Sequence, residues 1–261
     1  MWLAFGLTLV AGLATGLGGV ISTLIRAGSH RLLCASLGFS AGVMIYVSMM
    51  ELAPAAAALL SDAIGARPAG WVAAAAFFGG ILVAALIDWA VPSEFNPHEP
   101  SLDAHLNGRQ RTLARTGLIT AIAVALHNFP EGFATFMAAL EDPQLGIPVA
   151  IAVAIHNVPE GMAVAVPIHQ ATGSRRKGMI AAWLSGLAEP VGAVVGYLLL
   201  RPWLNDVTLG VVLALVAGIM VFISFDELLP TAEEYGEHHL ATYGLIAGMA
   251  VMALSLLLLA G

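Results

Sequence analysis

One six-residue phrase occurs twice in the chain, as HNFPEG at residues 127–132 and as HNVPEG at residues 156–161. Each copy lies within a long apolar run, which predicts that both copies belong to membrane-spanning helices. A carboxylate near the bilayer centre costs about 3 kcal/mol even on a lenient insertion scale. The two glutamates of the phrase, Glu131 and Glu160, therefore indicate a functional site inside the membrane.

The spacing within each copy places an imidazole beside a carboxylate. His127 and Glu131 are four residues apart, as are His156 and Glu160, so each pair shares one helix face. Only residues 141–145 join the two expected helices, which must then be antiparallel neighbours. Facing each other, they offer a His2Glu2 donor set that suits zinc and accepts iron(II) or manganese(II). A single such pair could be a buried packing pair, but the duplication favours a metal site.

Each copy also contains a proline and a glycine. Pro130 and Pro159 lack a backbone N–H, so the carbonyls four residues earlier lose their helical partners and both helices are predicted to kink. Freed carbonyls at membrane depth are tolerated only where they face protein, water or an ion. Gly132 and Gly161 would let a neighbouring helix approach closely.

The composition predicts an all-α polytopic membrane protein with one transmembrane domain over residues 1–261. Of the 261 residues, 59% are hydrophobic and only 10% are charged, against roughly 25% charged in a soluble domain. The lone Cys34 excludes an intrachain disulfide and a multi-thiolate zinc site. No basic segment precedes the first apolar run, so we expect a permanent helix there rather than a cleaved signal. The eight expected spans are 3–24, 32–52, 70–91, 118–140, 146–168, 178–200, 207–229 and 240–260.

The basic residues predict the orientation of these spans. Loops that follow odd-numbered spans carry eight Lys and Arg residues, whereas loops that follow even-numbered spans carry only Arg67 and Arg201. This positive-inside bias places the odd-numbered loops, including the long loop 92–115, in the cytoplasm. Both termini are then expected outside the cytoplasm.

A second internal similarity predicts an inverted repeat. Residues 51–54 and 227–230 both read Glu-Leu-x-Pro, at the expected ends of spans two and seven. These spans have opposite orientations, which fits spans 1–3 repeated as spans 6–8 around a central pair of spans 4 and 5. On this topology Glu51 lies at the outer mouth, and Asp226 and Glu227 lie at the inner mouth, as gate or pathway residues. A third intramembrane acid, Glu189, lies near mid-depth.

Histidines in two loops are weaker metal candidates. His98 and His105 lie in loop 92–115, which reads either as a metal-collecting segment or as an ordinary solvated linker. His238 and His239 follow three glutamates before the last span, where metal or proton handling and simple solvation are both plausible.

Taken together, these features resemble the ZIP (Zrt/Irt-like) divalent-metal transporters, and most of all their bacterial ZupT-like branch. The resemblance covers essentially the whole chain. It depends on the eight spans, the paired His-Asn-x-Pro-Glu-Gly segments, the Gly-Leu-Ala-Glu-Pro segment at residues 186–190 and the histidine-bearing loop between spans three and four.

The resemblance implies a central binuclear metal site. Its primary site would fall on His127, Glu131, His156, Glu160 and Glu189, with Met44 at its edge. A second site would fall on Asn128 and Asn157 together with the two shared carboxylates. Many relatives have a charged Asp where this chain has the neutral Asn157, so this position of the second site carries no charge here. Its oxygen-rich set would suit iron(II) or manganese(II) better than zinc. Met44 taken alone reads as a core residue.

The expected function is uptake of divalent metal into the cytoplasm by alternating access, with Zn²⁺ as substrate and Fe²⁺, Mn²⁺, Co²⁺ or Cd²⁺ as further candidates. We expect a cell-membrane location and no enzyme activity. The expected partners are metal ions and membrane lipid, with no nucleic acid; a homodimer is compatible with the sequence. Two alternatives remain at this stage: an intramembrane zinc hydrolase, although the chain has no His-Glu-x-x-His sequence, and a passive cation channel.

Overall fold

The computed structural model describes residues 1–24, 30–90, 109–235 and 238–259. Within these ranges it does not describe some side chains, among them those of residues 109–120 and of His127. His98 and His105 lie outside the described residues.

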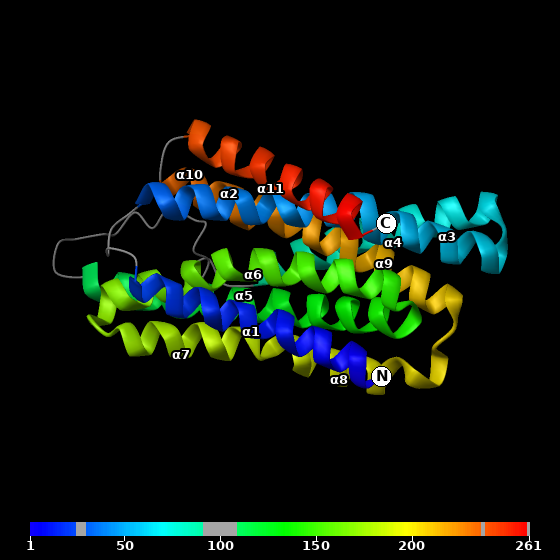
Figure 1. Ribbon diagram of the computed structural model, residues 1–261, viewed down its shortest axis with the longest axis horizontal. Helices are drawn as coiled ribbons and strands as arrows, with labels where there is room; N and C mark the ends of the chain where they lie inside the picture. The colour runs from blue at the N-terminus through cyan, green and yellow to red at the C-terminus, as the bar shows by residue number, and fades with distance from the viewer. Residues whose placement is uncertain (25–29, 91–108, 236–237, 260–261) are drawn as a thin grey trace.

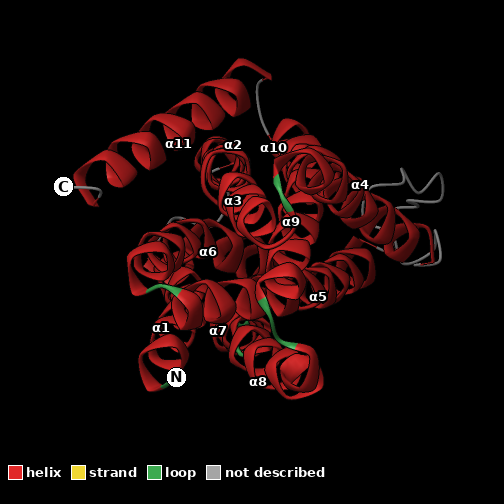
Figure 2. Cartoon of the chain, turned by 90° about the vertical axis from the view of Figure 1, so that its right-hand side faces the viewer, coloured by secondary structure: helices red, strands yellow, loops and turns green. Residues whose placement is uncertain are grey.

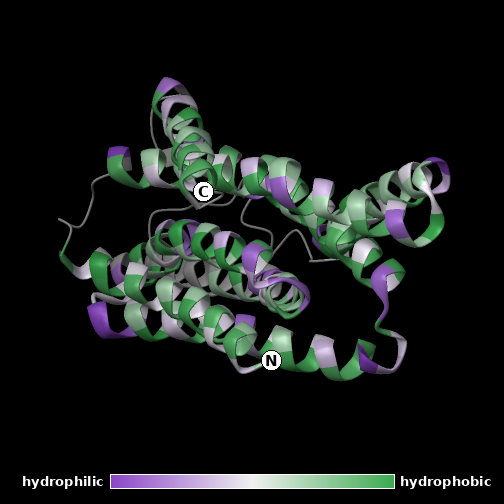
Figure 3. Cartoon of the chain, turned by 45° about the vertical axis from the view of Figure 1, so that its right-hand side comes forward, coloured by the Kyte–Doolittle hydropathy of each residue, from purple (hydrophilic) through white to green (hydrophobic). Residues whose placement is uncertain are grey.

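The described chain consists of helices joined by short loops, and it contains no strand (Figure 2). Within the described residues, seven helical segments are long and apolar enough to cross a membrane. Apolar residues dominate along the helices (Figure 3). The chain is therefore an all-helical, multi-pass membrane protein.

The helices of the described residues are α1 (Trp2–Leu24), α2 (His30–Val47), η1 (Ser48–Leu52), α3 (Ala53–Ile64), α4 (Ala66–Ala90), α5 (Arg109–Glu141), α6 (Pro143–Thr172), α7 (Arg175–Gly186), α8 (Ala188–Leu200), η2 (Arg201–Trp203), α9 (Asp206–Ile223), η3 (Ser224–Leu228), α10 (Leu229–Tyr235) and α11 (His238–Leu259).

The predicted ends of the second and seventh spans are wrong. The second span was expected to end at residue 52, but the chain stays helical to Ile64, and the seventh continues beyond residue 229 to Tyr235. In both places a short π-helix, η1 or η3, comes just before the proline. Its wider turn lets the N–H of the residue preceding the proline reach a carbonyl five residues back. The helix therefore passes the proline instead of stopping.

The helices form two groups that lie side by side (Figures 1 and 3). One group contains α1, α5, α6, α7 and α8, and the other contains α2, α3, α4, α9, α10 and α11. The groups meet where α2 packs against α6 and where α5 packs against α9. The central helices α5 and α6 thus face both their own group and the other one.

Helix packing is paired in the way that an inverted repeat requires. Extensive contacts join α1 to α6 and α5 to α8, and likewise α2 to α11 and α4 to α9. The repeat exchanges spans 1, 2 and 3 with spans 6, 7 and 8, and span 4 with span 5. Under this exchange the contact of α1 with α6 becomes the contact of α8 with α5, and the contact of α2 with α11 becomes the contact of α9 with α4. The inverted repeat remains a prediction, and this packing supports it.

Candidate metal site

The doubled phrase lies on two adjacent helices, α5 and α6. The link between them is shorter than the predicted five residues, because α5 ends at Glu141 and α6 begins at Pro143. Asp142 caps α6 by accepting a hydrogen bond from the backbone N–H of Gln144 at 2.8 Å. This tight turn confirms that the two helices are antiparallel neighbours. Both helices run through their prolines without interruption.

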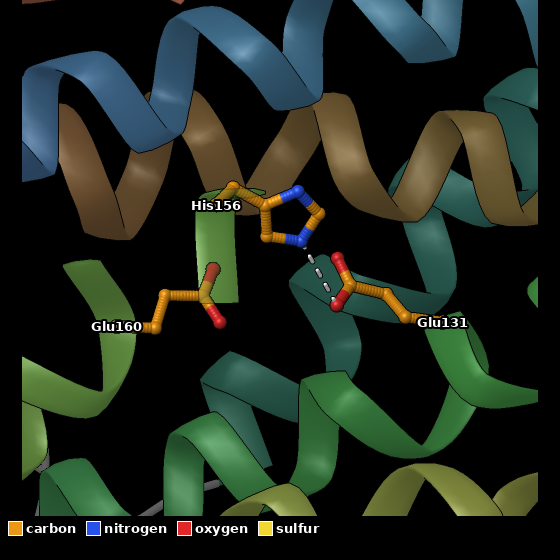
Figure 4. Close-up of side chains that lie close together, drawn as sticks. All are labelled: Glu131, His156 and Glu160. Atoms are coloured by element: carbon orange, nitrogen blue, oxygen red, sulfur yellow. Dashed lines mark hydrogen bonds and ion pairs between the residues drawn. The ribbon is translucent and has the colours of Figure 1, made fainter. Parts of the chain in front are cut away.

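Three side chains of the phrase meet between these helices. Glu131, His156 and Glu160 each offer one ligand atom, and these atoms all lie within 4.8 Å of one another. The Nε2 atom of His156 is 3.4 Å from Oε2 of Glu131 (Figure 4). The carboxylate of Glu160 enters the same space from α6. All three side chains are at most 1% exposed, so the group is enclosed by protein.

The charge of this group favours a bound cation. All ten Lys and Arg residues lie outside residues 118–168, so no basic side chain on these stretches of α5 and α6 can neutralise the buried carboxylates. Carboxylates that share a low-dielectric site disfavour each other's ionised form. A divalent cation or protons would relieve this repulsion. An imidazole nitrogen with two carboxylates is a donor set typical of zinc sites.

The fourth predicted member of the cluster, His127, cannot be placed. Its backbone belongs to α5, but its side chain is among those that the structure does not describe.

The asparagines and Glu189 form a second polar layer. Nδ2 of Asn157 donates to Oε1 of Glu189 and, at 2.8 Å, to the carbonyl of Ala11. Nδ2 of Asn128 donates to the carbonyl of Ser185 at 3.3 Å. Both asparagines are fully buried, and within the described chain their Oδ1 atoms have no hydrogen-bond partner. Buried amide oxygens of this kind can serve as ligands of a hard cation.

The other helix group contributes a residue that the sequence did not single out. The hydroxyl of Ser40, on α2, donates at 3.4 Å to Oε1 of Glu160 and lies at the same distance from the carbonyl oxygen of His156. The only sequence signal was its spacing of four residues from Met44, which puts both on one face of α2. Met44 is fully buried, and its role as a ligand stays a prediction.

The expected mouth residues are not members of the three-residue group. Glu51 is half-buried in η1, and Asp226 and Glu227 are half-buried in η3. Because their helices extend to Ile64 and Tyr235, these acids lie inside long helical segments and not at the ends as expected. η1 packs against α9, and η3 packs against α2, so each acid-bearing turn lies beside the repeat-related helix.

His238 and His239, which were expected in a loop, are the first two residues of α11. The side chain of His238 is not described, and the exposed ring of His239 stacks on Tyr243 with ring centroids 6.2 Å apart. A metal role for these residues stays a prediction.

A multi-pass helical protein with a buried, acid-rich, imidazole-bearing group between its helices has the features of an intramembrane metal transporter. The profile of the family described as ZIP Zinc transporter matches residues 96–256. Three similar proteins carry the name Zinc transporter ZupT. The protein from Corynebacterium glutamicum is 58% identical over 99% of both chains. That from Clostridium perfringens is 54% identical over 98% of this chain and 95% of its own. That from Streptococcus mutans is 55% identical over 99% of this chain and 98% of its own.

The chain therefore belongs to the ZIP family of zinc transporters. This membership makes it a transporter and not an enzyme, which removes the hydrolase alternative.

Proposed function

We propose that this protein carries Zn²⁺ across the cell membrane into the cytoplasm through a site between α5 and α6. The single observation that carries the proposal is the enclosed group of Glu131, His156 and Glu160, whose ligand atoms lie within 4.8 Å of one another. The relatives named as zinc transporters support it, since they match over nearly their whole length.

The proposed primary site uses one imidazole and one carboxylate from each copy of the phrase. His127 and Glu131 come from α5, and His156 and Glu160 come from α6, with Glu189 and Met44 completing the set. The proposed second site shares the two carboxylates and adds Asn128 and Asn157. Its oxygen donors favour a harder ion such as Fe²⁺ or Mn²⁺. Co²⁺ and Cd²⁺ are candidates for the primary site, which combines nitrogen, oxygen and sulfur donors.

The contact of the site with the other helix group supports alternating access. Ser40 belongs to one group and hydrogen-bonds Glu160 of the other. A sliding or rocking movement of one group against the other would break this contact and change the side from which the site is reached. Glu51 would act on the path between the outside and the site, and Asp226 and Glu227 would act on the path between the site and the cytoplasm. The positive-inside bias predicts that both termini face away from the cytoplasm.

The test is zinc uptake into sealed vesicles that contain the purified protein, with imposed pH and voltage gradients. A carrier predicts uptake that saturates with zinc concentration and is lost in Glu131→Gln at equal protein content. A passive channel predicts flux that follows voltage and does not saturate, and that result would replace the proposal. A homodimer is a separate prediction, to be checked by the mass of the detergent-solubilised protein.

A further inference from the structure

We infer that Thr15, on α1, is a further oxygen ligand of the central site and a determinant of its metal preference. The inference rests on the proposed function, because it extends the donor set around Asn128 and Asn157. A two-fold relation connects α1 with the α7–α8 pair, and in this relation Thr15 occupies the place that corresponds to Glu189.

Two glycines establish this relation. A Cβ atom added to Gly12 on α1 would overlap the carbonyl oxygen of Gly186 on α7, and a Cβ atom added to Gly186 would overlap the carbonyl oxygen of Gly12. The added atom on Gly12 would lie 3.3 Å from Cβ of Glu189, and the added atom on Gly186 would lie 3.0 Å from Cβ of Thr15. Thr15 follows Gly12 by three residues, as Glu189 follows Gly186. The two side chains therefore start from equivalent points.

The central helices repeat the same relation. Gly132 and Gly161 are the last residues of the two copies of the phrase. A Cβ atom on Gly132 would overlap the carbonyl oxygen of Glu189, whereas a Cβ atom on Gly161 would overlap the carbonyl oxygen of Thr15. Each copy of the phrase thus packs closely against one member of the pair.

The asparagine hydrogen bonds give an independent third match. Asn128 donates to the carbonyl of Ser185 and Asn157 donates to the carbonyl of Ala11. Ser185 precedes Glu189 by four residues, and Ala11 precedes Thr15 by four. The same residue spacing therefore relates α1 to the α7–α8 pair in three ways: in the close helix contacts, in the positions of the Cβ atoms and in the hydrogen bonds from the asparagines.

The hydroxyl of Thr15 is buried and available for a ligand. Thr15 is 0% exposed, and its Oγ1 atom has no hydrogen-bond partner in the described part of the chain. Thr8, on the same helix and equally buried, donates to the carbonyl of Ala4 at 3.0 Å, as helix threonines commonly do. The Oδ1 atom of Asn128 is buried without a partner as well. A buried hydroxyl without a partner destabilises the protein unless water or a cation contacts it.

Thr15 makes the two sides of the second polar layer, which contains Asn128, Asn157 and Glu189, unequal in charge. One side has the carboxylate of Glu189, which accepts a hydrogen bond from Asn157, and the corresponding place on the other side has the neutral hydroxyl of Thr15. Thr15 would add one more oxygen donor to the second site, whose other proposed donors are carboxylate and amide oxygens. Such a set suits Mn²⁺ better than Zn²⁺, which accepts nitrogen and sulfur ligands readily. We therefore assign Thr15 to the binding of a hard divalent cation.

The experiment measures equilibrium binding of Mn²⁺ and Zn²⁺ to the purified full-length protein. Thr15→Val keeps the branched shape and removes the hydroxyl, and the expected result is Mn²⁺ binding weakened about 10-fold with zinc binding changed less than about 2-fold. Thr15→Ser should restore Mn²⁺ binding. Thr8→Val is the matched control, because it removes a buried hydroxyl from the same helix, and it should leave both affinities unchanged.

Two further variants keep the outcome decisive. Thr15→Glu places a carboxylate opposite Glu189 and should tighten Mn²⁺ binding, and it serves if Thr15→Val fails to fold. Wild-type Mn²⁺ affinity in Thr15→Val or in Thr15→Glu would overturn the inference. Glu131→Gln measured in parallel separates the two levels: if that variant binds both metals normally, the proposed function itself fails.

Discussion

Glu131 and Glu160 are fully buried on α5 and α6, whereas Glu51 and Glu227 are half-buried in η1 and η3. All four lie close to a proline in a long apolar helix. At the centre, the α-helices continue through Pro130 and Pro159. At Glu51 and Glu227, which we call the peripheral carboxylates because they are only half-buried, a π-helical turn precedes the proline in each case.

This difference points to two roles for the carboxylates, one in binding the metal ion and one in its movement. The central carboxylates are enclosed with an imidazole, and their own spans contain no Lys or Arg. They therefore favour a bound cation. The peripheral carboxylates keep partial exposure, and π-helical turns are frequent at functional sites. We therefore expect changes at the centre to alter binding, and changes at the periphery to alter the rate of transport.

The largest effect is expected for Glu131→Gln and Glu160→Gln. Each change keeps the side-chain volume and removes one buried charge from the cluster. Zinc uptake into vesicles should fall by more than about 100-fold, as expected for loss of a charged metal ligand. Glu141→Gln is the matched control, because Glu141 is exposed at the end of α5. Near-normal uptake in either central variant would remove the distinction between the two regions.

His156→Ala should come next. It removes the nitrogen donor that lies 3.4 Å from Glu131 and leaves the oxygen donors in place. Zinc affinity should weaken about 10- to 100-fold and Mn²⁺ affinity much less, because Mn²⁺ prefers oxygen ligands. Isothermal titration with both metals checks this difference. Equal losses for the two ions would mean that the imidazole has no selective role.

Much of this arrangement could be predicted from the sequence. The doubled phrase was sufficient to place α5 and α6 side by side and to bring Glu131, His156 and Glu160 together. The ends of the second and seventh spans were wrong because proline normally terminates a helix, and no local pattern announces a π-helical turn. Ser40 was missed because one serine in an apolar run carries no periodic signal. Thr15 was missed because its match to Glu189 exists only in the packing of α1 against the α7–α8 pair.

Metal binding should also displace protons. Carboxylate and imidazole ligands bind a metal ion in their deprotonated forms, so protons compete with zinc for them. Zinc added to the weakly buffered protein should release about one proton per ion, and binding should weaken several-fold from about pH 7.5 to about pH 5.5. Zinc binding without proton release, and with no dependence on pH, would argue against this competition.

The smallest effect is expected at the periphery. Glu51→Gln and Glu227→Gln should slow zinc uptake about 3-fold while leaving equilibrium zinc binding unchanged, because these half-buried groups attract the ion without holding it in the central site. Uptake kinetics and titration on the same preparations measure the two quantities. A loss of zinc affinity equal to that of Glu131→Gln would show that the peripheral acids belong to the binding site.

The most direct measurement is anomalous X-ray scattering at the zinc edge from crystals grown with zinc. The account predicts a peak between α5 and α6, about 2.0–2.2 Å from carboxylate oxygens of Glu131 and Glu160 and from a ring nitrogen of His156. Zinc found only in the loops, with these three side chains turned away from one another, would contradict it.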